Sequence, residues 1–111
     1  MFVVEVFPVR DVVCLPIGVR LSVDKYGNVA VECFGMLPDG KRVSICTGNS
    51  TSGRVECRDV YDVCVDLRVC REIGEEIVRE CESMLQNTLT NIDSIVNTCR
   101  ILLRQLQQVK T

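Results

Sequence analysis

The C-terminal part of the chain decides the fold, because it carries one uninterrupted helical pattern. Residues 71–109 read REIGEEIVRECESMLQNTLTNIDSIVNTCRILLRQLQQV, with no proline and a single glycine. Apolar residues recur every three or four positions from Ile73 to Val109, which is the period of an α-helix. Acidic residues gather early in this stretch and basic residues late, an order that suits the helix dipole at both ends. The pattern therefore predicts a long amphipathic helix.

Such a helix would be too long for the rest of the chain to cover. About 40 helical residues would extend roughly 60 Å, whereas a domain of about 65 residues is only about 20–25 Å across. From Leu85 onward the apolar spacing alternates between four and three, which is typical of a coiled-coil seam. We therefore predict a homo-oligomer, most simply a two-fold dimer, with its interface at Leu85, Leu89, Ile92, Val96, Cys99, Leu103 and Leu106.

A helical hairpin is the alternative, with a turn near residue 90. The tetrapeptide Thr90-Asn91-Ile92-Asp93 resembles the start of a helix. A turn there would place Cys81 opposite Cys99, so that a disulfide could lock the two arms together. The single long helix is favoured, because the apolar stripe keeps its phase through residue 90 and the turn would contain neither glycine nor proline.

The first two thirds of the chain have the pattern of strands. Short runs rich in β-branched residues alternate apolar and polar positions, and they are separated by the turn sequences 25–28 and 38–40. We predict an α+β fold, with an N-terminal antiparallel β-meander domain at 1–67 followed by a C-terminal helical oligomerisation segment at 68–111. The meander is expected to have about five to six short strands, drawn from residues 2–7, 11–15, 19–24, 29–34, 41–47, 54–58 and 60–67.

Eight cysteines in 111 residues are roughly 7% of the chain, a little below the share that is typical of a disulfide scaffold. Their number is even, as a fully paired disulfide framework requires, and spacing alone does not choose among the pairings. Inert buried thiols are the other interpretation, because a free cysteine packs as a small hydrophobe. We predict disulfides, with these candidates: Cys14, Cys33, Cys46, Cys57, Cys64, Cys70, Cys81 and Cys99.

The cysteines also bear on where the protein works. The N-terminal residues lack a basic region and a continuous apolar run, so they do not resemble a signal peptide. Disulfide-rich proteins inside cells are a feature of hyperthermophiles, and arginine outnumbers lysine by ten to three. We expect an intracellular protein of a hyperthermophilic archaeon, or of its virus in the host cytoplasm. A secreted protein whose signal has been removed is the alternative.

Composition argues against several kinds of activity. The chain has no histidine, which removes the commonest general base and metal ligand, and no cysteine pair has zinc-ligand spacing. We therefore predict no enzymatic activity, no catalytic residues, no metal and no cofactor. No stretch is apolar enough for a transmembrane helix, so no membrane partner is expected. The expected function is that of a structural or interaction protein, and a nucleic-acid-associated regulator dimerised by the same helix is the alternative, weakened by the net charge of -2.

Overall fold

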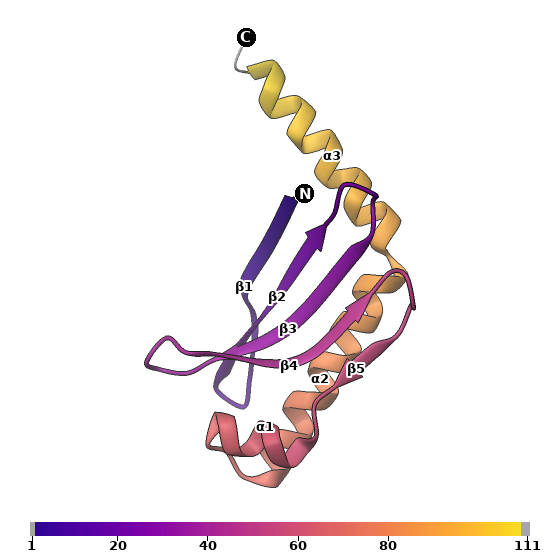
Figure 1. Ribbon diagram of the computed structural model, residues 1–111. Coiled ribbons are helices and arrows are strands. Elements are labelled where there is room, and N and C mark those ends of the chain that lie inside the picture. Colours follow the sequence, from indigo (N-terminus) through magenta and orange to yellow (C-terminus); the bar gives the residue numbers. More distant parts are fainter. Residues whose placement is uncertain (1, 110–111) are drawn as a thin grey trace.

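Five strands form one antiparallel sheet, and each strand pairs only with its neighbours in the chain (Figure 1). The computed structural model describes residues 2–109, apart from the side chains of Cys99, Leu103 and residues 106–109. The strands are β1 (Phe2–Val12), β2 (Leu15–Val23), β3 (Val29–Met36), β4 (Arg42–Asn49) and β5 (Val55–Cys57). Three helices follow, α1 (Val60–Leu67), α2 (Arg71–Thr90) and α3 (Ile92–Val109). The predicted α+β fold with an N-terminal β-meander is confirmed.

The two predicted turns are present, and local side chains hold the first of them. The Asp24 carboxylate accepts hydrogen bonds from the backbone N–H groups of Tyr26 and Asn28, each at 2.9 Å. Gly27 has a φ of 85°, which a residue without a Cβ adopts at little cost. The β2–β3 connection is therefore fixed by the sequence between Asp24 and Asn28.

The first strand is longer than predicted. The predicted strand covers residues 2–7, but β1 continues through a cis Phe7–Pro8 bond to Val12. The register with β2 shifts between Val6 and Arg10, and beyond the shift the two strands pair again. Proline is tolerated because β1 lies at the edge of the sheet, where a missing N–H does not break an inner ladder.

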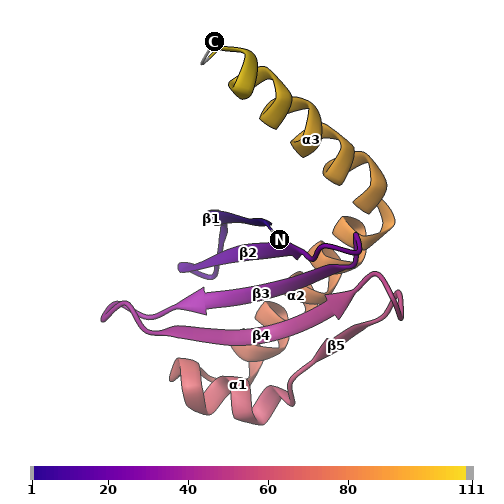
Figure 2. The same ribbon diagram turned by 45° about the horizontal axis from the view of Figure 1, so that its top comes forward.

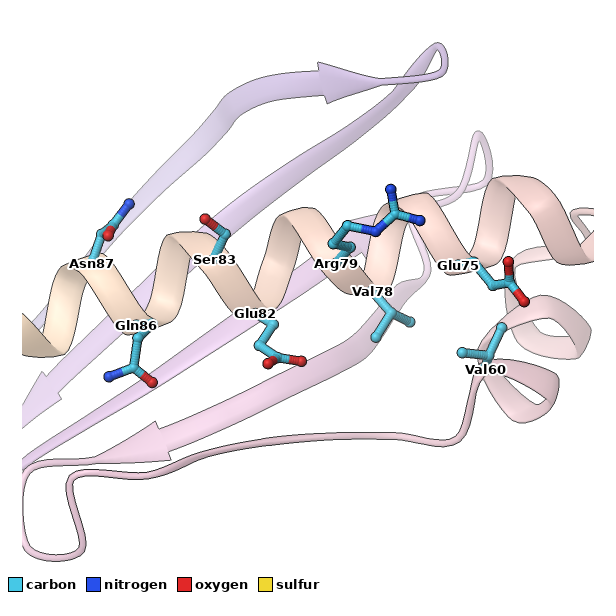
Figure 3. Close-up of a pocket in the computed structure, with 8 residues that line it drawn as sticks. All are labelled: Val60, Glu75, Val78, Arg79, Glu82, Ser83, Gln86 and Asn87. Atoms are coloured by element: carbon cyan, nitrogen blue, oxygen red, sulfur yellow. The ribbon is translucent and has the colours of Figure 1, made fainter.

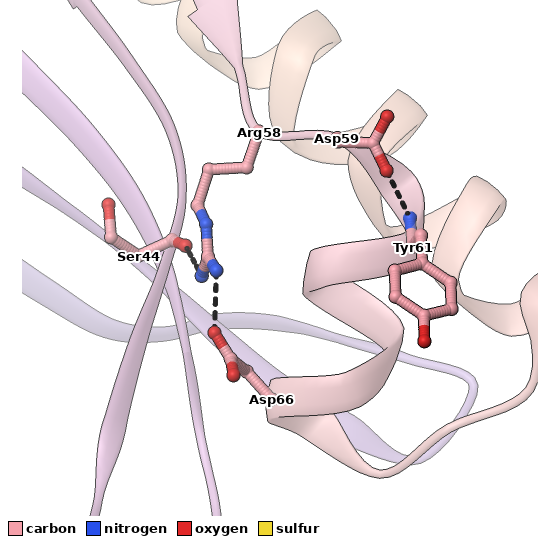
Figure 4. Close-up of polar contacts among 5 residues, drawn as sticks. All are labelled: Ser44, Arg58, Asp59, Tyr61 and Asp66. Carbon is pink, nitrogen blue, oxygen red and sulfur yellow. Dashed lines mark hydrogen bonds and ion pairs between the residues drawn. The ribbon is translucent and has the colours of Figure 1, made fainter.

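The segment 60–67, predicted to be a strand, is helix α1. Asp59 begins it, because its carboxylate accepts a hydrogen bond from the Tyr61 N–H at 2.8 Å (Figure 4). Val63 and Leu67, four residues apart, are the buried positions of the helix. Arg58 ties the helix to β4, since it donates to the Ser44 carbonyl at 3.1 Å and pairs with Asp66 at 2.6 Å.

Helix α2 lies across one face of the sheet, over β3, β4 and β5, and completes the core (Figure 2). Its buried residues recur with helical spacing, and Ile77 and Leu85 are fully buried. They pack against inward residues of the sheet such as Val31 and Ile45. The core of the described residues is aliphatic and contains no buried charged side chain.

A single residue separates α2 from α3. The side-chain hydroxyls of Thr88 and Thr90 donate to the carbonyls four residues earlier, and the Asn91 side chain donates to the Asn87 carbonyl at 2.9 Å. Side chains that capture helix carbonyls in this way compete with the backbone and bend helices. The predicted continuous helix is therefore interrupted at Asn91.

The alternative, a helical hairpin, is wrong. Beyond Asn91, α3 continues away from α2 in both views, and in Figure 1 it extends past the end of the sheet (Figures 1 and 2). Cys81, which the hairpin would have placed opposite Cys99, is bonded to Cys33 of β3 instead. The side chain of Cys99 lies outside the described residues.

On the other face of the sheet, two aromatic rings stack over a glycine. The Phe7 and Phe34 rings lie 5.7 Å apart between centroids. A Cβ on Gly18 would lie 2.7 Å from Phe34 Cζ and 2.9 Å from the Val6 backbone oxygen. Glycine at this position therefore gives the two rings the room to meet.

We expect Gly18→Ala to lower the free energy of unfolding by about 1–3 kcal/mol, the usual cost of forcing an extra methyl group into a packed site. The new Cβ would collide with both an aromatic ring and a backbone oxygen. The backbone oxygen cannot easily move away. Urea denaturation measures the effect. Ser22→Ala, on the same strand, is the control and should change stability by less than about 0.5 kcal/mol. Equal stability of the two variants would contradict the packing described for Phe7 and Phe34.

Candidate interaction surface

Some of the eight cysteines form disulfides and others carry free thiols. Cys33 and Cys81 join β3 to α2, with Cα atoms 5.6 Å apart, and Cys46 and Cys57 join β4 to β5, with Cα atoms 4.0 Å apart. The prediction of disulfides is thus confirmed for these four residues. Three others carry free thiols, namely Cys14, Cys64 and Cys70.

Two of the free thiols lie where α1 meets α2. The Cys64 thiol donates to the Cys70 carbonyl at 3.5 Å. A Cβ on Gly74 would collide with the Cys64 sulfur, so this glycine allows the close approach of the two helices. The arrangement is explained by helix packing. Among the described residues, no group of three or more Cys, Asp or Glu side chains is placed to hold a metal ion.

A polar depression of about 550 Å³ runs along α2 and reaches Val60 of α1 (Figure 3). Its charged residues are Glu75, Arg79 and Glu82, and Glu75 also pairs with Arg71 at 3.0 Å. Glu75 and Glu82 are seven residues apart on one helix, which is about 10 Å along its axis. That separation is too long for two carboxylates to share a proton or an ion directly.

The second depression is apolar and lies beside β1. We call it the β1 groove, a cavity of about 380 Å³ lined by Val4, Val6, Val9, Met84, Thr88 and Ile95, together with the adjoining residues of β2. Arg10 borders it, and its ion pair with Glu80 at 3.0 Å links β1 to α2. The groove exists because α2 packs mainly on β3, β4 and β5, so that Val4 and Val6 of β1 on the same face stay exposed.

The valines of this groove are unusually exposed for apolar residues. Val6 is 54% exposed, Val9 39% and Val4 37%. The sequence analysis did not identify these valines as a surface. The signal was present in the consecutive Val3 and Val4, since a strand buried on one face alternates and a run that is apolar on both faces needs a cover on each.

The predicted oligomer interface divides into two parts at Asn91. Leu85 and Leu89 are buried in the core of their own chain, at 0% and 9% exposure. Ile92 and Val96, at the start of α3, are half-buried and pack against the same core. The side chains of the other three predicted residues, Cys99, Leu103 and Leu106, lie outside the described residues.

Farther along α3 the described apolar side chains lose this cover. Ile101 is 50% exposed and Leu102 is 53% exposed. Leu102 lies seven residues after Ile95, so it continues the stripe that begins on the core, whereas Ile101 lies about half a turn away from Ile92 around the helix. An apolar stripe therefore runs from the body of the protein onto a part of α3 with no described packing partner.

Two basic residues on α3 are candidates for binding nucleic acid. Arg100 and Arg104 are both exposed and lie one helical turn apart. Nucleic-acid binding remains a prediction at this site. No helix of the described residues is long and apolar enough to cross a membrane.

The charged surface elsewhere stabilises the sheet. Glu5 of β1 pairs through both carboxylate oxygens with Arg42 of β4, on the face opposite α2. The hydrogen bond from Arg42 lowers the pKa of Glu5 below its ordinary value, because the guanidinium favours the ionised carboxylate. The contact is a bidentate ion pair between two strands that are not neighbours.

This pair predicts a loss of stability in acid. Because the Glu5 pKa is lower in the folded state, its contribution is complete above the unfolded pKa of about 4.3 and declines as the pH falls through the folded value. We expect Glu5→Gln to be less stable than the natural protein at pH 7, with the difference shrinking toward zero near pH 2. Urea denaturation at both pH values measures this. A difference that stays constant with pH would contradict an ionic origin.

No family model matches the chain, and no curated protein or solved structure is significantly similar to it.

Proposed function

We propose that the protein is a non-enzymatic interaction protein that self-associates through α3, most simply as a dimer. The single observation that carries the proposal is the exposure of Leu102 on the apolar stripe of a helix that extends past the sheet. A helix with one apolar side and no packing partner is stabilised when a second surface covers that side.

The distribution of exposed apolar residues supports this function. Among the described large apolar side chains that remain exposed, four lie on β1, two on α3 and two on α1. Soluble monomers rarely leave contiguous apolar areas uncovered, and larger ones usually mark interaction sites. The polar cavity on α2, in contrast, lacks a pair of carboxylates close enough for acid–base catalysis.

The test is the oligomeric state of a variant of the stripe. We expect the natural protein to sediment as a dimer at micromolar concentration, and Leu102→Asp to sediment as a monomer, because a charge on the stripe would be buried without a partner. Ile101→Asp is the matched control, since it has the same exposure on the same helix but lies off the stripe. A natural protein that is monomeric throughout the micromolar range would overturn the proposal.

The proposed setting is intracellular, in a hyperthermophilic archaeon or its virus. Its support is the pair of disulfides, because disulfides inside cells are a feature of hyperthermophiles. Thermal unfolding tests it. A protein from such a source is expected to unfold above about 90 °C, and a midpoint in the mesophilic range of about 45–65 °C would overturn this part of the proposal.

A further inference from the structure

The sheet is wider than the helix that covers it. Neighbouring strands lie about 4.8 Å apart, so five strands present about 20 Å of width, whereas one helix with its side chains is about 10 Å wide. Helix α2 packs mainly on β3, β4 and β5, and Leu21 and Val23 of β2 are buried as well. The outer part of this width, at β1, stays open, since Val4 and Val6 are exposed there, and the β1 groove lies at that edge.

The groove is lined mainly by apolar side chains, as a site that packs against a helix would be. Val4 and Val6 pair across the strands with Leu21 and Val19, so apolar side chains of both strands face the same side as α2. Met84 of α2 forms one wall of the groove. The occupant should therefore present an apolar stripe to the sheet.

The described part of the chain contains one helix that is not packed along its length, and it is α3. Its 18 residues extend about 27 Å, which is close to the length of α2. Only the start of α3 reaches the groove of its own chain, through Ile95, because the helix continues away from α2 beyond Asn91. A second copy of the chain can supply it.

Charge favours an antiparallel arrangement of α3 from one copy beside α2 of the other. Between residues 71 and 90 there are five glutamates and two arginines, whereas α3 has Asp93 near its start and Arg100 and Arg104 later. With a two-fold axis near Asn91, the late part of α3 lies beside the early part of α2. The two arginines then approach Glu76 and Glu80, which lie one turn apart on the side of α2 toward β1.

We propose that the β1 groove binds α3 of a second copy, so that two chains exchange these helices around a two-fold axis near Asn91. This rests on the proposed function, because it names the surface to which α3 binds. Each chain contributes one helix and one groove, and the interface is therefore closed with two copies. Ile95, which lines the groove at the start of α3, lies next to the axis.

The first test compares substitutions on the two faces of β1. We expect Val6→Asp, in the groove, to raise the dimer dissociation constant by about tenfold or more, because it buries a charge in the interface. Val3→Asp is the matched control. Val3 has a similar exposure of 45% and pairs with Ser22 on the opposite face, so its dimer should be unchanged.

The second test mixes two variants that are each monomeric alone. Chains with Val6→Asp retain α3, and chains with Leu102→Asp retain the groove, so the mixture should form a heterodimer with one intact helix–groove contact. If α3 bound only α3, a mixed pair would contain one charged stripe and no heterodimer would form, whereas Val6→Asp chains would pair with each other. Analytical ultracentrifugation of the mixture separates these results.

The outcomes distinguish this inference from the proposed function. A monomeric Leu102→Asp together with a Val6→Asp dimer as tight as the natural one would overturn the groove and leave association through α3 standing. A Leu102→Asp that remains a dimer would overturn both. Should Val6→Asp fail to fold, filtered NOE spectra of the natural protein, mixed from labelled and unlabelled chains, replace it. Contacts between Val6 methyl groups and α3 of the other chain are expected, and contacts between α3 helices alone would overturn the inference.

Discussion

Removing the Cys33–Cys81 disulfide is expected to lower the free energy of unfolding by about 4 kcal/mol. The bond closes a loop with a sequence separation of 48 residues, and the chain-entropy relation gives about this value for a loop of that size. The loop begins in β3 and ends in α2, so in the unfolded chain the bond restrains the relative position of the sheet and the helix that covers it. The double variant Cys33→Ala/Cys81→Ala should show a midpoint of thermal unfolding lower by roughly 15–30 °C.

The other disulfide is the control for this effect. Cys46 and Cys57 are separated by 11 residues and join two adjacent strands, so the same relation predicts a loss of about 3 kcal/mol for Cys46→Ala/Cys57→Ala. Alkylation without reduction, followed by intact mass, verifies that the expected pair is absent in each variant. Equal losses, or a larger loss for the short loop, would contradict loop closure as the main source of stability.

The strands were predictable where one face is buried and the other is solvated. Residues 19–23 and 29–33 alternate, and the structure buries Leu21, Val23, Val29, Val31 and Cys33 as the alternation requires. The turn after Asp24 was predictable for a local reason as well, since its hydrogen bonds lie within five residues. Alternation and local turn chemistry need no knowledge of the rest of the fold.

Helix α1 was not recognised because its eight residues satisfy both periods. Val63, Val65 and Leu67 alternate as in a strand, while Val63 and Leu67 alone are spaced as in a helix. In the structure Val65 is 57% exposed, which agrees with the helical period, because a strand would bury Val65 together with Val63 and Leu67. Asp59 was the available signal, because an aspartate before a short apolar segment is a preferred helix start.

The β1 groove could not be found from the sequence, because it depends on where α2 lies on the sheet. Whether the valines of β1 are core or surface is determined by the lateral position of one helix, and helical periodicity specifies only which side of the helix is apolar. The break at Asn91 had a local cause in Thr88, Thr90 and Asn91. The apolar stripe keeps its helical phase through these residues, so the sequence pattern predicted one continuous helix there.

The heptad spacing that predicted one interface covers two different surfaces, the core of the chain before Asn91 and an exposed stripe on α3 after it. Leu85→Ala is expected to lower the free energy of unfolding of each chain by about 2–5 kcal/mol, because Leu85 is fully buried and its loss leaves a cavity. Leu102→Ala removes a side chain that is half exposed within its own chain, so it should change that stability by less than about 0.5 kcal/mol. Urea denaturation at concentrations low enough for monomers measures both.

We expect the two substitutions to rank in the opposite order in their effect on the dimer dissociation constant. Leu102→Ala is expected to weaken the dimer, since Leu102 belongs to the stripe that α3 offers to another chain, whereas Leu85→Ala should weaken it only as far as the unfolded fraction increases. The dissociation constant of the folded protein, measured by sedimentation under conditions where both variants are folded, separates the two effects. A folded Leu85→Ala that dimerises more weakly than Leu102→Ala would mean that the seam before Asn91 also lies at the interface between chains.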